Sequence, residues 1–161
     1  MIASNSTPII NFGRQGKLDI LRKCFDEIII PKSVYDEIMQ KKESPEAIIL
    51  DKSISEKWII VEDVAINPLL NTMSLGKGEK EAISLALQRK CGLLIDDDYA
   101  KAYAKILNVE SHGSFYVLYL ACLKKIINKE EAKNVFESMI REGFYVSTDL
   151  YSRFLELLGK I

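Results

Sequence analysis

Three adjacent aspartates, Asp96, Asp97 and Asp98, are the part of this sequence best suited to chemistry, because they directly follow a short apolar run at residues 93–95. Three neighbouring carboxylates repel one another unless a cation or a basic group compensates their charge. In the simpler interpretation they are solvated loop acids that cap the next helix, with Asp98 as the N-cap. We favour a metal or catalytic cluster, because other segments supply further acids.

Two of these segments place carboxylates beside apolar helical stripes. Glu37 shares a helical face with Val34 and Ile38, although taken alone it is most simply a residue at the boundary of that face. Glu79 also lies in line with an apolar stripe, where an acid is costly unless it is paired or bound to a metal. Glu81 is the neighbouring acid, and an ordinary charge at the start of a helix is the simpler interpretation for both.

The elements that must position these acids follow from the apolar pattern. Short continuous apolar runs predict strands at residues 1–4, 27–30, 58–61 and 93–95, and a further strand at 144–146. Helical spacing predicts helices from residue 8, at 17–25, 32–41, 44–54, 74–90, 98–107, 113–126 and 129–142, and after residue 148, with Thr7, Ser44, Ser74 and Thr148 as helix-start residues. This alternation indicates an α/β fold with a parallel sheet covered on both faces. The chain has no internal repeat and no linker, so we expect one domain over residues 1–161.

The carboxyl ends of parallel strands are where ligands bind in open α/β sheets. Asn5 follows the first predicted strand, and the three aspartates follow the fourth. Together with Glu37 and the acids after Gly78, they place oxygen ligands from four remote segments at one end of the sheet. Hard divalent cations prefer such ligands. Two such ions about 4 Å apart can activate water and stabilise the leaving oxygen in phosphodiester hydrolysis.

In four segments the sequence resembles the PIN-domain family, and the order and spacing of these segments match the family's four acidic motifs. They are residues 2–10 (IASNSTPII), 30–38 (IPKSVYDEI), 75–83 (LGKGEKEAI) and 94–100 (LIDDDYA). The resemblance covers nearly the whole chain and is closest to a prokaryotic subgroup that includes toxin ribonucleases of toxin–antitoxin pairs.

The resemblance implies a three-layer α/β/α fold around a mostly parallel sheet, and cleavage of RNA that depends on Mg²⁺ or Mn²⁺. It also implies a homodimer and, for a toxin, inhibition by a small antitoxin protein. By position it assigns catalytic or metal-binding roles to Glu37, Glu79, Asp96 and Asp98, with Glu81 and Asp97 as further ligands and Ser6 and Ser114 as supporting hydroxyls. Where the family's first motif carries an aspartate, this chain has Asn5, whose amide oxygen can ligate a metal but brings no charge.

Composition excludes several other kinds of site. Cys24, Cys91 and Cys122 are widely spaced and form neither a disulfide framework nor a zinc pattern, so we expect reduced, mostly buried thiols. The single histidine, His112, excludes a His-rich metal site and is expected in a loop or at a strand end. The net charge of −1 gives no global case for nucleic-acid binding. The basic stretch at residues 14–23 is most simply a solvated helix face.

No apolar run is long enough to span a membrane, and the N-terminal residues do not resemble a secretory signal, so we expect a cytoplasmic protein. A dinucleotide site is excluded because Gly76 and Gly78 lack the third glycine and precede acids. A phosphoacceptor domain would need paired acids where Asn5 stands alone. The remaining alternative to a nuclease is a PIN-like module that binds a protein partner and has little or no catalysis.

Overall fold

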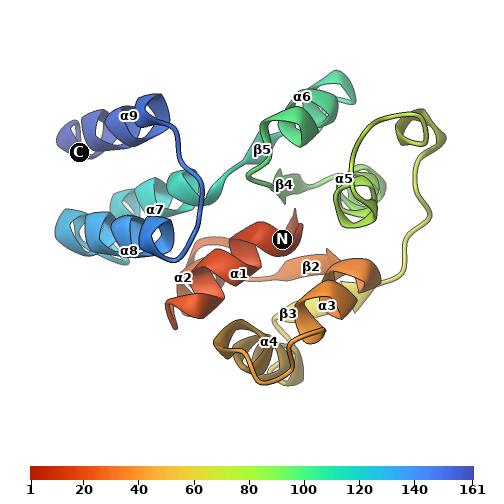
Figure 1. Cartoon of the computed structure of the whole chain (residues 1–161), viewed down its shortest axis with the longest axis horizontal. Coiled ribbons are helices and arrows are strands. Elements are labelled where there is room, and N and C mark those ends of the chain that lie inside the picture. The colour runs from red at the N-terminus through yellow and green to blue at the C-terminus, as the bar shows by residue number, and fades with distance from the viewer.

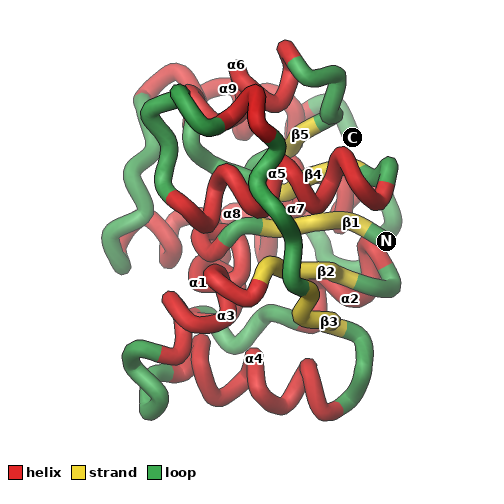
Figure 2. The backbone as a smooth tube through the Cα atoms, turned by 90° about the vertical axis from the view of Figure 1, so that its right-hand side faces the viewer, coloured by secondary structure: helices red, strands yellow, loops and turns green.

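Five short strands form one parallel sheet in the computed structural model, which describes residues 1–161. They are β1 (Ile2–Ser4), β2 (Ile28–Pro31), β3 (Ile59–Glu62), β4 (Gly92–Leu94) and β5 (Ser111–His112). Their order in the sheet is β3-β2-β1-β4-β5, and every neighbouring pair is parallel. Figure 2 shows this order from the bottom of the sheet to the top.

Nine α-helices flank the sheet and complete three layers, as Figure 1 shows. They are α1 (Ser6–Arg14), α2 (Asp19–Phe25), α3 (Lys32–Met39), α4 (Pro45–Ser55), α5 (Lys77–Arg89), α6 (Asp98–Ile106), α7 (Ser114–Leu123), α8 (Lys129–Arg141) and α9 (Thr148–Gly159), with a 3₁₀ turn, η1 (Pro68–Leu70), before α5. The predicted three-layer α/β/α fold is therefore confirmed. None of the helices is both long and apolar enough to cross a membrane.

The two faces of the sheet bury two separate apolar clusters, because successive side chains of a strand point to opposite faces. Ile28 and Ile30 of β2 join the larger cluster, to which helices α1–α4 and α7–α9 contribute. Ile29, between them, joins the smaller cluster beneath α5 and α6. The strands carry apolar residues on both faces, as expected for strands covered on both sides.

Four predicted helix starts are wrong by one or two residues. The N-caps are Asn5, Gly76, Asp97 and Ser147, where the sequence pattern predicted Thr7, Ser74, Asp98 and Thr148. In two cases the reason is that the residue before the predicted cap accepts the free N–H group: Asp97 Oδ1 from Ala100 and Ser147 Oγ from Leu150. The predicted start at Ser44 is confirmed, since its hydroxyl accepts from Ala47 N–H.

The predicted strand at residues 144–146 is wrong, and the fifth strand is β5 instead. Phe144 and Val146 are partly buried against the larger apolar cluster, whereas Tyr145 between them is exposed. This alternation looks strand-like in the sequence. It arises because the segment lies against helices, where no strand edge is available for pairing.

Candidate functional site

The order of the strands creates a switch point between β1 and β4, since the chain builds the sheet outward from β1 in one direction and then returns to add β4 on its other side. Ser4 pairs in register with Leu94, and the N–H of Asn5 donates to Leu94 O at 3.1 Å. Asn5 and Asp96 thus leave the carboxyl ends of two adjacent strands. Ligands of open α/β sheets bind in the crevice at such a point.

Asp96 is held in one orientation by Ser114, the first residue of α7. The Ser114 N–H donates to Oδ1 of Asp96 and the Ser114 hydroxyl to Oδ2, both at 2.7 Å. Asn11 of α1, which is buried like Ser114, donates its side-chain N–H to the Ser114 hydroxyl oxygen at 3.3 Å. Burial raises the pKa of Asp96 above its ordinary value, and the two bonds from Ser114 and the charge of Lys101 act in the opposite direction.

Gly113, which precedes Ser114, allows this close approach. A Cβ at position 113 would lie 2.7 Å from Asp96 Oδ1 and 3.0 Å from Lys101 Nζ. Both separations are shorter than a relaxed contact, so a side chain here would displace the carboxylate or the ammonium group. The same geometry places Lys101 beside Asp96, although they are not within 4.0 Å of each other as an ion pair.

Glu79 faces the same site from the first turn of α5. Its Oε2 accepts from the Gly76 N–H at 3.2 Å. Burial raises the pKa of Glu79, as do the nearby charges of Asp97 and Glu37, while the bond from Gly76 lowers it. These three carboxylates, from α3, α5 and the end of β4, are therefore close enough to repel one another.

Gly78 brings α5 onto α3 and so brings Glu37 toward Glu79. A Cβ at position 78 would lie 3.4 Å from Val34 Cγ2 and 3.6 Å from Glu37 Oε2. Helix α5 thus meets α3 without an intervening side chain at this position. The sequence placed Glu37 at the edge of its helix's apolar face, and the structure shows Val34 buried on that face.

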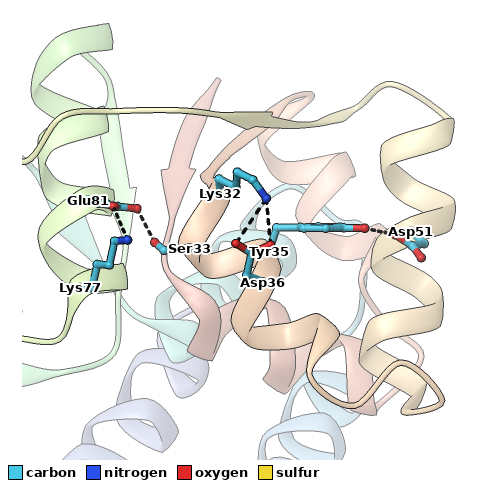
Figure 3. A network of polar contacts seen from close by, with 7 residues as sticks. All are labelled: Lys32, Ser33, Tyr35, Asp36, Asp51, Lys77 and Glu81. Atoms are coloured by element: carbon cyan, nitrogen blue, oxygen red, sulfur yellow. Dashed lines mark hydrogen bonds and ion pairs between the residues drawn. The ribbon is translucent and has the colours of Figure 1, made fainter.

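Glu81, in contrast, is directed to a different partner. Its Oε2 accepts a hydrogen bond from the Ser33 hydroxyl of α3, and Lys77 Nζ lies 3.8 Å from its Oε1, as Figure 3 shows. The residue is 9% exposed and lines a separate groove together with Asp36 and Asp63. The structure therefore assigns Glu81 a role in joining α3 to α5, and its predicted role as a further metal ligand stays a prediction.

An open cleft of about 800 Å³ borders the switch point. Glu79, Asp96, Asp97 and Asp98 line it, so four of the predicted acids open to one space. Asp97 and Asp98 are exposed, and Asp97 also caps α6 through Ala100 N–H at 2.8 Å. Ser6 is buried as the first residue of α1.

One buried atom at this point has no partner. Asn5 is only 3% exposed. Its amide oxygen Oδ1 is inaccessible to solvent and accepts no hydrogen bond. An unsatisfied buried acceptor is costly, and a cation would satisfy it. Carboxylate and amide oxygens are the donors that a hard divalent cation prefers, so the residues present fit such an ion in chemical type. No three His, Cys, Asp or Glu side chains stand close enough to form a ready metal-ligating group.

The family model of the PIN domain, of the type DUF3368, matches residues 1–160. The chain therefore belongs to the PIN-domain family, which confirms the resemblance based on the four sequence motifs. Proteins with this domain are typically metal-dependent nucleases that bind divalent metals. Comparison with curated proteins gives no significant match.

One solved structure supports the fold. A PilT N-terminus domain protein from the hyperthermophilic archaeon Sulfolobus solfataricus P2 has a TM-score of 0.53 at 22% sequence identity, over 73% of this chain and 90% of that chain. A domain of a functionally unknown protein from Methanocaldococcus jannaschii DSM 2661 has a TM-score of 0.48 at 25% identity, over 70% of this chain and 89% of that chain. The first of these likenesses shows the fold alone.

The structure adds residues that the sequence pattern did not single out. Asn11 and Ser33 each hydrogen-bond to a predicted site residue, and Lys101 lies beside Asp96. None of the three had a signal in the sequence, because their roles depend on how helices pack together.

The basic stretch at residues 14–23 forms ion pairs rather than a free cationic surface. Its members pair with acids of α2, α4 and α8 at 3.0–3.4 Å. The pairs are Arg14 with Glu46, Lys17 with Glu131, Arg22 with Glu56 at the C-cap of α4, and Lys23 with Asp19. The expected single solvated helix face is therefore not what the structure shows, since Arg14 ends α1, Lys17 lies between helices, and Arg22 and Lys23 lie in α2. His112 ends β5 and stacks on Tyr116, and the three cysteines are free, with Cys24 and Cys122 buried.

Proposed function

We propose that this PIN-domain protein is a ribonuclease that hydrolyses the RNA backbone with Mg²⁺ or Mn²⁺ bound at the switch point. The observation that carries the proposal is the unpartnered, buried Oδ1 of Asn5 at the end of β1, next to the strand that leads to Asp96, while Asp96 and Glu79 line one cleft. An acceptor that is kept dry and unbonded is unfavourable in the protein alone. It becomes favourable when a cation occupies the site.

The residues that would hold the metal are Asn5, Asp96 and Glu79, with Glu37, Asp97 and Asp98 close to them. When bound, the metal would activate water and stabilise the leaving oxygen of the phosphodiester. Ser114 orients the carboxylate of Asp96, and Asn11 orients the Ser114 hydroxyl. These bonds hold the Asp96 carboxylate in place before a cation binds, which reduces the entropic cost of ordering the carboxylate.

Cleavage of labelled RNA with Mn²⁺ or Mg²⁺, with and without chelator, tests this function. We expect cleavage only with the metal, and a loss on the order of 100-fold or more in Glu79→Gln. Asp36→Asn is the matched control, because Asp36 lies on the exposed side of α3 and pairs with Lys32 at 3.1 Å. Cleavage that persists in chelator, or that Glu79→Gln leaves unchanged, contradicts the proposal.

A protein-binding module with weak or no catalysis is the second candidate. Two observations favour it: Asn5 brings no charge to the site, and both oxygens of Asp96 already accept hydrogen bonds from Ser114. This candidate predicts a stable complex with a protein partner and no metal-dependent cleavage by the purified chain.

The proposal extends to a role as a toxin and to a homodimer. If the protein is a toxin, a small antitoxin protein encoded beside it should co-purify and suppress cleavage by covering the acidic cleft with a basic side chain. Sedimentation of the purified chain tests the homodimer. A native preparation that contains no such partner contradicts the toxin role and leaves the nuclease standing alone.

A further inference from the structure

Lys101 of α6 is the cation that acts on the Asp96 carboxylate. Burial raises the pKa of Asp96, and the positive charge of Lys101 lowers it. Two other cations, Arg14 and Arg153, line the same cleft. Arg14 is held by Glu46 at 3.4 Å, and Arg153 is exposed. The balance of charge at Asp96 therefore depends on Lys101.

The Lys101 side chain does not pair with the acids one turn earlier in its own helix. Asp97 and Asp98 precede it by four and three residues, the spacings at which acids and lysines pair on a helix surface. Other lysines of this chain form such pairs at 3.0–3.8 Å: Lys23 with Asp19, Lys32 with Asp36 and Lys77 with Glu81. The Nζ of Lys101 lies instead beside Gly113, next to the Asp96 carboxylate.

Gly113 provides the space that the ammonium group uses. Figure 1 shows α6 beside β5, the strand that leads to this glycine. A Cβ at position 113 would lie 2.7 Å from Asp96 Oδ1 and 3.0 Å from Lys101 Nζ, so both charged groups border the volume that a side chain would fill. They form no ion pair within 4.0 Å. The carboxylate and the ammonium group are therefore close enough to attract each other, but they are not locked together.

The two groups differ in how firmly they are held. Both oxygens of Asp96 accept hydrogen bonds from Ser114 at 2.7 Å. Lys101 is half-buried, and its ammonium group forms neither a hydrogen bond nor an ion pair at the end of a flexible four-carbon chain. A second cation that binds Asp96 would therefore move the lysine and leave the carboxylate in place.

We propose that Lys101 is the internal counter-cation of this site. Its ammonium group compensates the charge of Asp96 while no metal is bound, and it opposes the binding of a divalent cation because like charges repel. The part that concerns the metal rests on the proposed metal-dependent function. The site would then bind its metal only at concentrations high enough to overcome this repulsion, so Lys101 would regulate the site from within the chain.

A double-mutant cycle of Lys101→Met and Asp96→Asn, measured by thermal unfolding in chelator, tests the compensation of charge. Lys101→Met keeps an unbranched side chain and should lower the melting temperature by about 2–4 °C. In the Asp96→Asn background it should have little effect, because the charge that Lys101 compensates is gone. Lys105→Met is the matched control, an exposed lysine of the same helix that forms no ion pair, and it should have little effect in either background. An equal effect of Lys101→Met in both backgrounds overturns the compensation.

Calorimetric titration with Mn²⁺, at one pH and one salt concentration, tests the opposition to metal without measuring cleavage. We expect Lys101→Met to bind Mn²⁺ about 10-fold more tightly than the unsubstituted protein, because a nearby positive charge has been removed. Lys105→Met has the same net charge but should bind Mn²⁺ like the unsubstituted protein. Lys101→Arg keeps the charge and should neither tighten binding nor lower the melting temperature in chelator. Unchanged or weaker Mn²⁺ binding by Lys101→Met overturns the opposition to metal.

The two measurements separate this inference from the nuclease proposal. Coupling between Lys101 and Asp96 in chelator, with tighter Mn²⁺ binding by Lys101→Met, supports the inference even in a protein that never cleaves RNA, and that protein would overturn the nuclease. Metal-dependent cleavage without such coupling supports the nuclease and overturns the inference. Failure of every variant to bind Mn²⁺ overturns both the opposition to metal and the nuclease.

Discussion

Ser114 is the residue on which the orientation of Asp96 depends, because it donates to both carboxylate oxygens. Its backbone N–H would remain in any variant, but its hydroxyl also accepts the bond from Asn11. Removing that hydroxyl leaves two buried polar groups without their partner. The bonds therefore link the stability of the fold to the geometry of the candidate metal site.

Ser114→Ala should destabilise the protein by about 1–3 kcal/mol, because it leaves the buried Asn11 amide unsatisfied and frees Oδ2 of Asp96. Chemical denaturation measures this change, and metal titration should show weaker binding. Ser55→Ala is the control, since the Ser55 hydroxyl is exposed and donates only to Lys52 O of its own helix. A Ser114 variant as stable as the Ser55 variant would show that the bonds contribute little.

Asn5→Asp should change stability in opposite directions with and without metal. Adding a like charge to the acids should lower the stability of the chelated protein, while the added anionic oxygen should tighten Mn²⁺ binding by on the order of 1 kcal/mol. Melting curves in chelator and in Mn²⁺, together with the cleavage rate at subsaturating metal, measure both effects. A substitution silent in all three would place Asn5 outside the site.

At the scale of helices, α1 and α4 approach each other closely. A Cβ at Gly13 would lie 2.9 Å from Glu46 Cβ and 3.0 Å from Glu46 Cα, so the two backbones meet at this glycine. Because α1 begins directly after Asn5, the position of α4 helps to fix how the chain leaves β1. A change at Gly13 should thus affect the site as well as the stability.

Gly13→Ala should destabilise the protein by about 1–3 kcal/mol, since the added methyl group has no space. Gly159→Ala is the matched control: Gly159 also lies in a helix, but a Cβ there meets nothing within 4 Å. That variant should be neutral or slightly stabilised, because alanine favours a helix more than glycine does. Equal effects of the two substitutions would contradict a tight α1–α4 contact.

Helix packing also explains which site residues could be predicted. Glu79 and Glu81 are two residues apart, and the sequence predicted Glu79 as a site residue and Glu81 as a further ligand, but residues two positions apart on a helix point in different directions. Which of them opens to the cleft depends on how α5 meets α3 at Gly78, and local spacing does not contain that information. Placing the three aspartates and Asn5 at strand ends needed only the order of strands and helices, so it succeeded.

The fold of the whole molecule could be predicted because two apolar patterns alternate along the chain: short continuous runs and stripes with helical spacing. Continuous short runs such as residues 28–30 and 93–95 became strands buried on both faces, and helical stripes became their cover. The part of the cleft that Tyr145 lines could not be predicted, because it requires α9 to return to the cleft that α1 and α6 border. Contacts between segments so far apart in sequence leave no local pattern.

The acid cluster should give the whole protein an unusual response to pH in chelator. The pKa values of Asp96 and Glu79 are raised above their ordinary values of 3.8 and 4.5, chiefly by burial, so the folded protein binds protons to them more tightly than the unfolded chain does. Their contribution to stability is therefore fully present below those ordinary values and is lost as pH rises through the raised pKa values.

Melting temperatures measured in chelator over a range of mildly acidic to neutral pH test this response. Asp96→Asn and Glu79→Gln should each reduce the loss of stability on raising the pH, and Asp36→Asn should not. Mn²⁺ should reverse the trend, because it binds the charged carboxylates and so stabilises the protein more at higher pH. An identical pH response in all four proteins would contradict the assignment.

The shortness of β5 has a consequence for how copies of this chain can associate. A sheet edge presents unpaired N–H and C=O groups that can recruit a strand from another molecule. Here the edge strand is only two residues long, and His112 at its end stacks on Tyr116 with ring centroids 3.8 Å apart. So short an edge offers little to a neighbouring strand, which protects the protein from edge-to-edge aggregation on this side. A homodimer would therefore not extend the sheet at β5 and would have to use helical surfaces there.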